Sequence, residues 1–291
     1  MPDGLDHIVH AVRDLDAAAA FYERAGFMVG VRNRHPFGTH NRIVQLDGFY
    51  FELLTVAEPD KIPPAAEDVF SFGSYHRAFL SERQGLSMLL QKSRDATADA
   101  RAFDATGIGG YKTFDFAREG VRPDGSPVKL AFSLAFAQDR TSPHVRFAVC
   151  QHHYPENFWN PAFQIHANGA QHVLGAVMVA SRPSEHERFL AALTGARSAS
   201  TETGGIMVAM SNSTLEAIEP AAFRGRYGVE PALMGEGMFL NGLRMAVTDL
   251  DRTEAVLRRN GIVFARRGEH LVIPPNVAFG ATLAFEQPKV S

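Results

Sequence analysis

The sequence of 291 residues contains a single cysteine, which excludes an intrachain disulfide and a zinc site built from several cysteines. Neither sign of charge is in large excess, because 29 basic and 32 acidic residues give a net charge of −3. This balance argues against a nucleic-acid protein that acts through a broad basic field. Apolar runs reach only about half of the roughly 20 residues that cross a membrane, and the first residues lack the basic start and apolar run of a signal peptide. We therefore expect a soluble, cytoplasmic protein without a nucleic-acid or membrane partner.

The length and the apolar content predict a folded protein of about two domains. At roughly 150 residues per domain, 291 residues make two. A hydrophobic fraction of 45% is typical of globular proteins and not of disordered chains. A turn-rich stretch at 160–170 lies near the middle of the chain. We place the boundary there, which gives an N-terminal domain at 1–165 and a C-terminal domain at 166–291.

A pattern of strand and helix signals recurs four times along the chain. Asp14 and Gly26 delimit a predicted helix after the apolar run 5–12, and Asp249 and Gly261, also twelve residues apart, delimit another after 243–247. Weaker copies cover 86–107 and 173–195, and β-rich runs follow each helix, the first of them at 27–32. The predicted unit is one strand, one helix and three strands, at about 4–57, 85–155, 171–220 and 240–287. Such units must pair to bury the open faces of their sheets.

Short motifs in the first unit carry a family likeness. They are Leu5-Asp6-His7, Asp14-Leu15-Asp16 and Phe21-Tyr22, with the segments 38–42 and 50–54. Together with the fourfold unit, these motifs resemble the vicinal oxygen chelate superfamily and, more narrowly, its glyoxalase-like branch. The likeness implies an α+β fold of four βαβββ modules, paired into two cupped, partly open β-barrel domains. It also implies a divalent metal ion, held by residues from the first and last strands of the units.

His7 and Glu52 match the first-strand and last-strand metal ligands of this superfamily. Glu52 lies inside the apolar run 49–54, where a carboxylate is costly unless it is paired or bound to a metal. Alternating positions of a strand share a face, so Tyr50 faces the same side as Glu52. Simpler interpretations stay open, with His7 as a half-buried histidine and Glu52 paired with an arginine such as Arg42.

The second unit offers a third ligand in His152. Alternation along 144–154 places His152, and not His153, on the face of Cys150, unless a bulge swaps the two histidines. His7, Glu52 and His152 would form a set of two histidines and one carboxylate. Such a set suits a divalent metal with open positions, and Zn, Mn, Fe(II) and Ni remain candidates. Cys150 itself is interpreted as inert core.

Five side chains are predicted to contact the substrate. They are Asn41, Tyr50, Tyr154, Trp159 and His166. The aromatic residues would line an apolar pocket for an organic molecule. Packing in the core is an alternative for Trp159, and a role in the turn at 164–169 is an alternative for His166.

The C-terminal half departs from the ligand pattern. Gly175 falls at the position of His7 in the third unit, Arg244 or a neighbour falls there in the fourth, and only Glu216 keeps a last-strand carboxylate. A four-unit extradiol dioxygenase of the usual design would carry its metal in this half, so the sequence argues against that design. We expect the C-terminal half to be structural, to shape the pocket or to form a dimer interface.

These features predict a metal-dependent lyase or isomerase that acts on a small oxygenated organic molecule. The metal would act as a Lewis acid, and Glu52 and His152 are the predicted catalytic residues, with Glu52 able to shuttle a proton. An iron(II) ring-cleaving or other dioxygenase at the same N-terminal site is one alternative. A metal-free binding or resistance protein is the other. The expected partner is a small-molecule substrate, and the interpretation allows for a homodimer.

Overall fold

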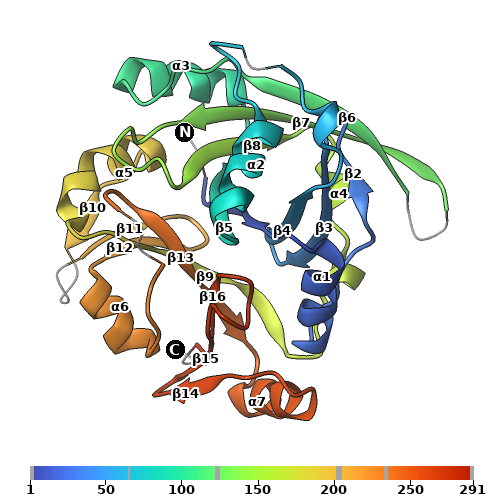
Figure 1. The fold of residues 1–291 in the computed structure, drawn as a ribbon, viewed down its shortest axis with the longest axis vertical. Coiled ribbons are helices and arrows are strands. Elements are labelled where there is room, and N and C mark those ends of the chain that lie inside the picture. Colours follow the sequence, from blue (N-terminus) through green and yellow to red (C-terminus); the bar gives the residue numbers. More distant parts are fainter. Residues whose placement is uncertain (1–2, 65, 122–124, 201–204, 233–234, 289–291) are drawn as a thin grey trace.

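The computed structural model describes residues 3–64, 66–121, 125–200, 205–232 and 235–288, and within them the strands form two eight-stranded sheets. The strands of the first sheet are β1 (Leu5–Ala11), β2 (Asn33–Arg34), β3 (Thr39–Leu46), β4 (Phe49–Val56), β5 (Gly85–Lys92), β6 (Phe114–Val121), β7 (Pro127–Ala137) and β8 (Arg146–His152). Their spatial order is β2-β3-β4-β1-β5-β8-β7-β6. In Figure 1 the β6–β7 hairpin extends beyond the rest of this sheet.

The second sheet has the same topology as the first. Its strands are β9 (Ala170–Val179), β10 (Ser198–Ser200), β11 (Ile206–Ala209), β12 (Thr214–Ile218), β13 (Phe239–Val247), β14 (Ala265–Arg267), β15 (His270–Ile273) and β16 (Thr282–Glu286). The order β10-β11-β12-β9-β13-β16-β15-β14 repeats that of the first sheet, strand for strand.

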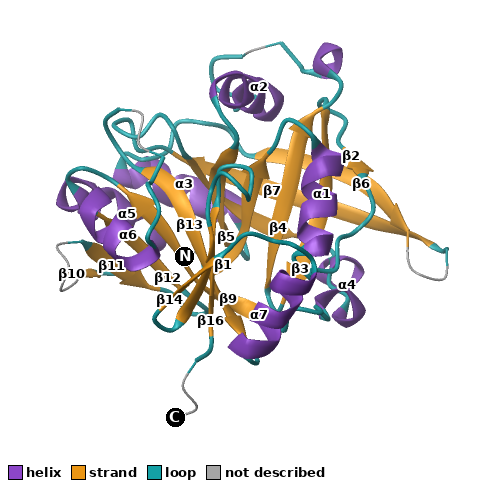
Figure 2. Ribbon diagram, turned by 60° about the horizontal axis from the view of Figure 1, so that its bottom comes forward, coloured by secondary structure: helices purple, strands orange, loops and turns teal. Residues whose placement is uncertain are grey.

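The helices flank the two sheets (Figure 2). They are α1 (Leu15–Arg24), α2 (Phe72–Glu82), α3 (Ala96–Thr106), α4 (Pro155–Phe158), α5 (Glu187–Thr194), α6 (Pro220–Tyr227) and α7 (Leu250–Arg259), with 3-10 helices η1 (Pro59–Lys61), η2 (Pro161–Gln164) and η3 (Pro183–His186). None of the helices in the described ranges is both long enough and apolar enough to cross a lipid bilayer.

Each group of four strands has the predicted element order of strand, helix and three strands, with α1, α3, α5 and α7 as the helices. The side chains of Asp14 and Asp249 accept hydrogen bonds from the first amides of α1 and α7, which explains where these helices begin. The predicted α+β fold class, two sheets built from such modules, is confirmed.

One predicted strand is displaced. Residues 27–32 do not pair as a strand, and pairing begins only at β2. Phe27 is instead buried between the two sheets, with its ring 6.1 Å from that of Phe51 and 6.0 Å from that of Phe285. The amide of Gly30 still donates to the carbonyl of Ile43 on β3, so the segment runs beside the sheet without forming a ladder.

The two sheets share one hydrophobic core, which includes Ile8 and Phe51 from the first and Leu243 and Phe285 from the second. The backbones of the two halves approach each other closely at Gly280, whose φ is 88°, because a Cβ there would lie 2.2 Å from the carbonyl oxygen of Gln84. The predicted boundary near residue 165 falls between β8 and β9. The division into two domains stays a prediction.

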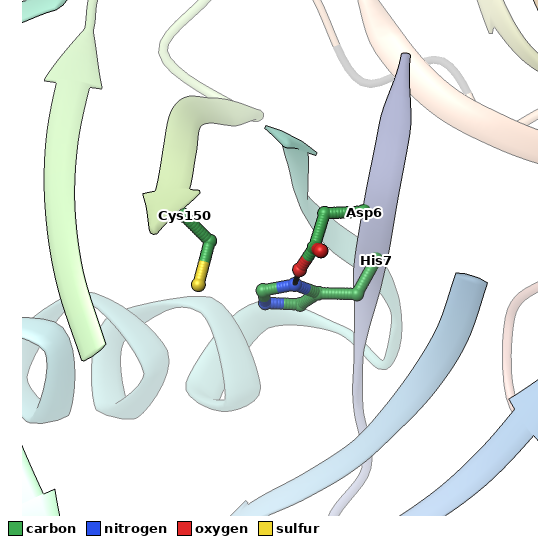
Figure 3. A group of neighbouring side chains, drawn as sticks. All are labelled: Asp6, His7 and Cys150. Carbon is green, nitrogen blue, oxygen red and sulfur yellow. Dashed lines mark hydrogen bonds and ion pairs between the residues drawn. The ribbon is translucent and has the colours of Figure 1, made fainter. Parts of the chain in front are cut away.

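A β-bulge interrupts β1 at its start. Leu5 pairs with Gln91 on β5, but the next pair is His7 with Leu90, so Asp6 is an extra residue on β1. An extra residue breaks the strict alternation of side chains. Asp6 and His7 are consecutive, yet both side chains point toward β8 (Figure 3).

Candidate functional site

A closed cavity lies within the curve of the first sheet, with a volume of about 30 Å³. Seven of the side chains around it are aromatic, and the polar ones gather around a buried carboxylate. The lining residues are His7, His35, Phe37, Asn41, Ile43, Tyr50, Glu52, Phe72, Phe114, Phe116, Arg118, Phe132, Leu134, Cys150 and Phe158.

His7 and Glu52 meet in this cavity. In the parallel pairing of β1 with β4, His7 lies opposite Tyr50 and Val9 lies opposite Glu52, so the two ligand candidates occupy neighbouring positions on one face. His7 Nε2 is 3.9 Å from Glu52 Oε2, and both side chains are buried. The ring of Tyr50 stacks on the imidazole of His7, with centroids 4.3 Å apart and planes 15° apart, and so fixes the orientation of His7.

Glu52 is a buried carboxylate without an arginine or lysine partner among the described residues. Asn41 Nδ2 donates to Glu52 Oε1 at 2.6 Å, so the predicted substrate residue Asn41 holds the carboxylate. Burial raises the pKa of Glu52, and the charge of His7, the Asn41 hydrogen bond and the charge of Arg118 offset this only in part. The alternative partner Arg42 turns away and pairs with Asp16 at 3.1 Å.

Asp6 fixes the tautomer of His7. His7 Nδ1 lies 2.6 Å from Asp6 Oδ2, and since a carboxylate only accepts, this nitrogen carries the proton and leaves the lone pair of Nε2 toward Glu52. The same oxygen lies 3.2 Å from His152 Nε2. Burial would raise the pKa of Asp6, but the charges and hydrogen bonds of His152 and His7 lower it well below its ordinary value. Asp6 therefore stays ionised between two histidines.

The structure places His152 beside Asp6, and Glu52 is not its partner. Its ring is stacked on that of Trp159, with centroids 5.9 Å and planes 18° apart, and its Nδ1 has no hydrogen-bond partner among the described atoms. His153, the neighbour that a bulge would have exchanged with it, bonds through Nε2 to Ser133 Oγ at 2.8 Å. His152 thus connects to His7 through Asp6.

Cys150 points toward the same histidine (Figure 3). One ligand atom each from Asp6, His7 and Cys150 lie within 4.8 Å of one another, which makes this group a possible metal site among the described residues. Burial raises the pKa of the Cys150 thiol well above its ordinary value, and the charges of Asp6 and Glu52 raise it further. No local pattern sets Cys150 apart from ordinary core, because Asp6 and His7, its neighbours in space, come from β1.

Two further polar side chains in the cavity escaped the sequence analysis. His35 Nε2 is 3.8 Å from Glu52 Oε1, and its other nitrogen bonds to Thr39 Oγ1 at 2.8 Å. Burial, with help from nearby positive groups such as Arg118, lowers the pKa of His35 to about 3, so this ring is neutral near pH 7. His35 precedes β3 in a loop, and no sequence pattern indicates that it faces the cavity. Arg118 alternates with Phe114 and Phe116 on β6, and this alternation could have predicted that it shares their face.

Three of the predicted substrate residues, Tyr154, Trp159 and His166, are not part of the cavity lining, and Trp159 instead stacks on His152. Tyr154 packs over Lys129, whose Nζ is 5.3 Å from the ring centroid. His166 accepts the amide hydrogen of Met28 through Nδ1 at 3.0 Å and donates from Nε2 to the carbonyl of Gln45 at 2.7 Å. Both ring nitrogens of His166 therefore form hydrogen bonds with backbone groups, as in the alternative role of His166 in the turn at 164–169.

The inner face of the second sheet carries different side chains from the inner face of the first. Glu216 accepts from Arg226 Nη1 at 2.6 Å and from Arg244 Nη1 at 2.7 Å, and Arg244 also binds Glu286. Phe223 and Tyr227 of α6 pack on this face within a hydrophobic cluster. The C-terminal half, expected from the sequence to lack the ligand pattern, carries ion pairs and packed rings on this face.

Comparisons with solved structures agree with this topology. A hypothetical protein from Staphylococcus aureus superposes with a TM-score of 0.68 and 12% identity, over 98% of this chain and 99% of that one. A variant of 4-hydroxymandelate synthase from Streptomyces coelicolor gives a TM-score of 0.62 and 11% identity, over 100% of this chain and 94% of that one. A fusion of a xylose isomerase-like TIM barrel with a 4-hydroxyphenylpyruvate dioxygenase gives 0.55 and 12%, over 100% of this chain and 49% of that one.

Sequence comparison identifies a family. No curated protein sequence matches the chain. A profile of the glyoxalase-like domain family matches residues 5–194, which is more than half of the chain and includes every side chain of the cavity. The chain therefore belongs to the glyoxalase-like domain family and has the fold of the vicinal oxygen chelate superfamily.

Proposed function

We propose that this protein is a metal-dependent enzyme of the lyase or isomerase type that acts on a small oxygenated organic molecule. His7 Nε2 and the Glu52 carboxylate are the proposed metal ligands. One observation carries the proposal: these two donors face each other at 3.9 Å at the polar side of a closed, aromatic cavity.

The chemistry of the donors fits a divalent first-row metal. Adjacent ligands bonded at about 2.1 Å in a tetrahedral site lie roughly 3.4 Å apart, so a small closing motion brings His7 and Glu52 to that spacing. A metal-bound histidine usually donates its other N–H to a carboxylate, and His7 Nδ1 has this contact with Asp6 at 2.6 Å. The cavity of about 30 Å³ admits an ion with a water molecule.

The position of His152 suggests a supporting role. Its Nε2 bonds to Asp6, which in turn orients His7, so we assign His152 to the outer shell of the site. The group of Asp6, His7 and Cys150 is the competing metal position. The hydrogen bond between His7 Nδ1 and Asp6 opposes a metal bound through Nδ1, because that metal would have to displace the proton.

When bound, the ion would supply Lewis-acid polarisation of substrate oxygens. Glu52 would move a proton, since its raised pKa brings a carboxyl group closer to neutral pH. Tyr50 and Asp6 would keep the imidazole of His7 in one orientation. The aromatic wall would keep bulk water from the reacting atoms.

Metal binding to chelator-treated protein tests the proposal. Zn²⁺, Mn²⁺, Fe²⁺ or Ni²⁺ at a hundredfold excess over its Kd should raise the Tm by roughly 5–10 °C. His7→Ala and Glu52→Gln should abolish that rise. His153→Ala and Glu156→Gln, which change exposed residues close by, serve as matched controls and should retain it. If no metal raises the Tm of the wild-type protein and none is found by elemental analysis, the site acts without metal and the proposal fails.

An iron(II) oxygenase is a second candidate, because His7 and Glu52 face each other in the cavity and a second histidine, His152, lies behind Asp6, the partner of His7. Solved structures named as a 4-hydroxyphenylpyruvate dioxygenase fusion and a 4-hydroxymandelate synthase share the fold. Consumption of oxygen that depends on Fe²⁺ and on a bound organic substrate would favour this candidate. Turnover with Zn²⁺ or Mn²⁺ and without oxygen would favour the lyase or isomerase.

A further inference from the structure

Arg118 is a cation without a carboxylate partner at the edge of the cavity. It is half-buried on β6, and Nη1 donates to Asn33 Oδ1 at 3.1 Å and to the carbonyl of Glu119 at 3.4 Å. Within the described residues, no carboxylate lies within 4.0 Å of its guanidinium, although most other half-buried arginines of the chain have one nearby or a stacked ring. A charge that is partly removed from water usually has a partner of opposite sign.

The charge of Arg118 acts on the polar side of the cavity. Arg118 lines the cavity together with Glu52 and Tyr50; burial lowers the pKa of Arg118, while the charges of these two residues raise it. Its positive charge also lowers the pKa of His35. The neighbouring Arg32 is neutralised by Asp16 at 2.7 Å, so it does not share this property.

Arg118 also lies between the closed cavity and an open groove. Ile43, Arg118 and Phe158 line both the cavity and a groove of about 610 Å³ that runs along β2, β3, β6 and β7. A molecule with a ring exceeds the closed cavity, so its bound form must extend from the site of Glu52 past Arg118 into the groove. The surfaces on both sides are apolar, with Phe116 and Phe132 toward the cavity and Leu130 toward the groove.

From this placement we propose that Arg118 is a specificity-determining residue that selects an organic acid, a substrate with one carboxylate beside an apolar, ring-sized body. The carboxylate forms a paired hydrogen bond with the guanidinium, for which the planar fork of arginine is suited. The apolar body contacts Phe116, Phe132 and Phe158, whose rings form a continuous wall with centroids 5.1 Å and 5.9 Å apart. The inference rests on the proposed function only in taking this cavity as the substrate site.

Binding of simple probes tests the assignment by calorimetry at pH 7. The probes are benzoate, phenylacetate and 3-phenylpropanoate, each compared with its neutral primary amide. We expect at least one acid to bind the wild-type protein at least tenfold more tightly than its amide. Arg118→Met keeps the apolar stem of the side chain and should remove that preference, and Arg118→Lys should restore part of it. Arg34→Met is the matched control, because it removes an exposed arginine from β2 and should leave binding unchanged.

Three results would overturn the assignment. They are equal affinity of Arg118→Met and wild type for the acids, equal affinity of acids and amides for the wild type, and binding of none of the acids. Unchanged Tm values establish that each variant is folded. The titrations are run on metal-free and metal-loaded protein, so a preference that survives without metal supports Arg118 even where the metal proposal fails. Metal uptake without any preference for acids would support the metal proposal and contradict the role of Arg118.

Discussion

The two sheets carry the same buried carboxylate with different surroundings. Glu52 lies opposite Val9 in the pairing of β4 with β1, and Glu216 lies opposite Val177 in the pairing of β12 with β9. Glu216 binds two arginines, Arg226 and Arg244, whereas Glu52 receives one hydrogen bond from an amide. One sheet therefore neutralises its carboxylate with two arginines, and the other leaves its carboxylate without an arginine or lysine partner among the described residues.

The position equivalent to His7 shows how the difference arises. Gly175 occupies it in the second sheet, opposite Thr214, where His7 has Tyr50. A Cβ at Gly175 would lie 2.4 Å from Thr214 Oγ1, so no side chain fits there. The space is used by Arg244, which pairs with Gly175 across β13. The same topology thus produces a candidate ligand pair in one sheet and an ion pair in the other.

The largest expected effect is a difference in metal affinity between variants of the two carboxylates, Glu52 and Glu216. Glu52→Gln removes a direct ligand and should weaken metal binding by more than about 100-fold, since even outer-shell partners are worth 10–100-fold. Glu216→Gln changes the equivalent residue and should leave affinity unchanged wherever the protein is folded. Titration of metal-free protein by calorimetry measures both. Equal losses in the two variants would mean that the sheets do not differ in the way proposed.

Stability should show the opposite pattern. Glu216→Gln leaves two arginines without their shared partner and should lower the free energy of unfolding by about 2 kcal/mol, a value reduced from that of fully buried pairs because both arginines are partly exposed. Urea denaturation measures the loss, with Glu236→Gln, an exposed change in the same half, as control. A loss no greater than that of the control would show that the arginines find other partners.

The pH dependence of stability should also differ between the two sheets. Burial raises the pKa of Glu52, so the unfolded state ionises first, and metal-free protein loses stability as pH rises above the ordinary value of 4.5. Glu286 works in the other direction: burial would raise its pKa, but the hydrogen bonds from Arg244 and His270 lower it to about 2. Its contribution is present above pH 4.5 and is lost as pH falls toward 2.

Denaturation of metal-free wild type and Glu52→Gln between pH 4.5 and pH 8 isolates the first of these trends. The free energy of unfolding of Glu52→Gln should increase relative to that of the wild type as pH rises. Added metal should prevent the fall in the stability of the wild type. A constant difference across the range would place the titration of Glu52 outside it, and the proposed contrast between the sheets would lose its electrostatic basis.

The smallest effect is expected at Cys150. If the metal lies on the Nε2 side of His7, Cys150→Ser should change metal affinity by less than about threefold, because a buried thiol with a raised pKa is a poor ligand. Calorimetry with Zn²⁺, the metal that thiolates prefer among the candidates, gives the most sensitive test. A large loss would move the metal to the group of Asp6, His7 and Cys150.

The fold followed from local signals that the structure reproduces. Helix caps such as Asp14 and Asp249, and the recurring order of strand and helix, were sufficient for the architecture. The displaced strand near Phe27 depended on a contact with Phe285, more than two hundred positions away, which no local pattern contains.

The site was less accessible to sequence reasoning. The family positions indicated His7 and Glu52, but strict alternation would turn Asp6 to the opposite face, and only the bulge brings it to His7. Alternation predicts His152 on the face of Cys150, but it gives no information on the contact of its imidazole with Asp6. The compartment, the assembly and the metal stay predictions.

The bulge in β1 also has a consequence for how such a site could arise. A partner for a histidine normally requires a substitution on another strand that happens to face it, whereas one inserted residue turns the neighbour in sequence into a neighbour in space. Deleting that single position would remove Asp6 and take its carboxylate away from both histidines at once. A length change of one residue is thus enough to connect or disconnect the support of the candidate ligand His7.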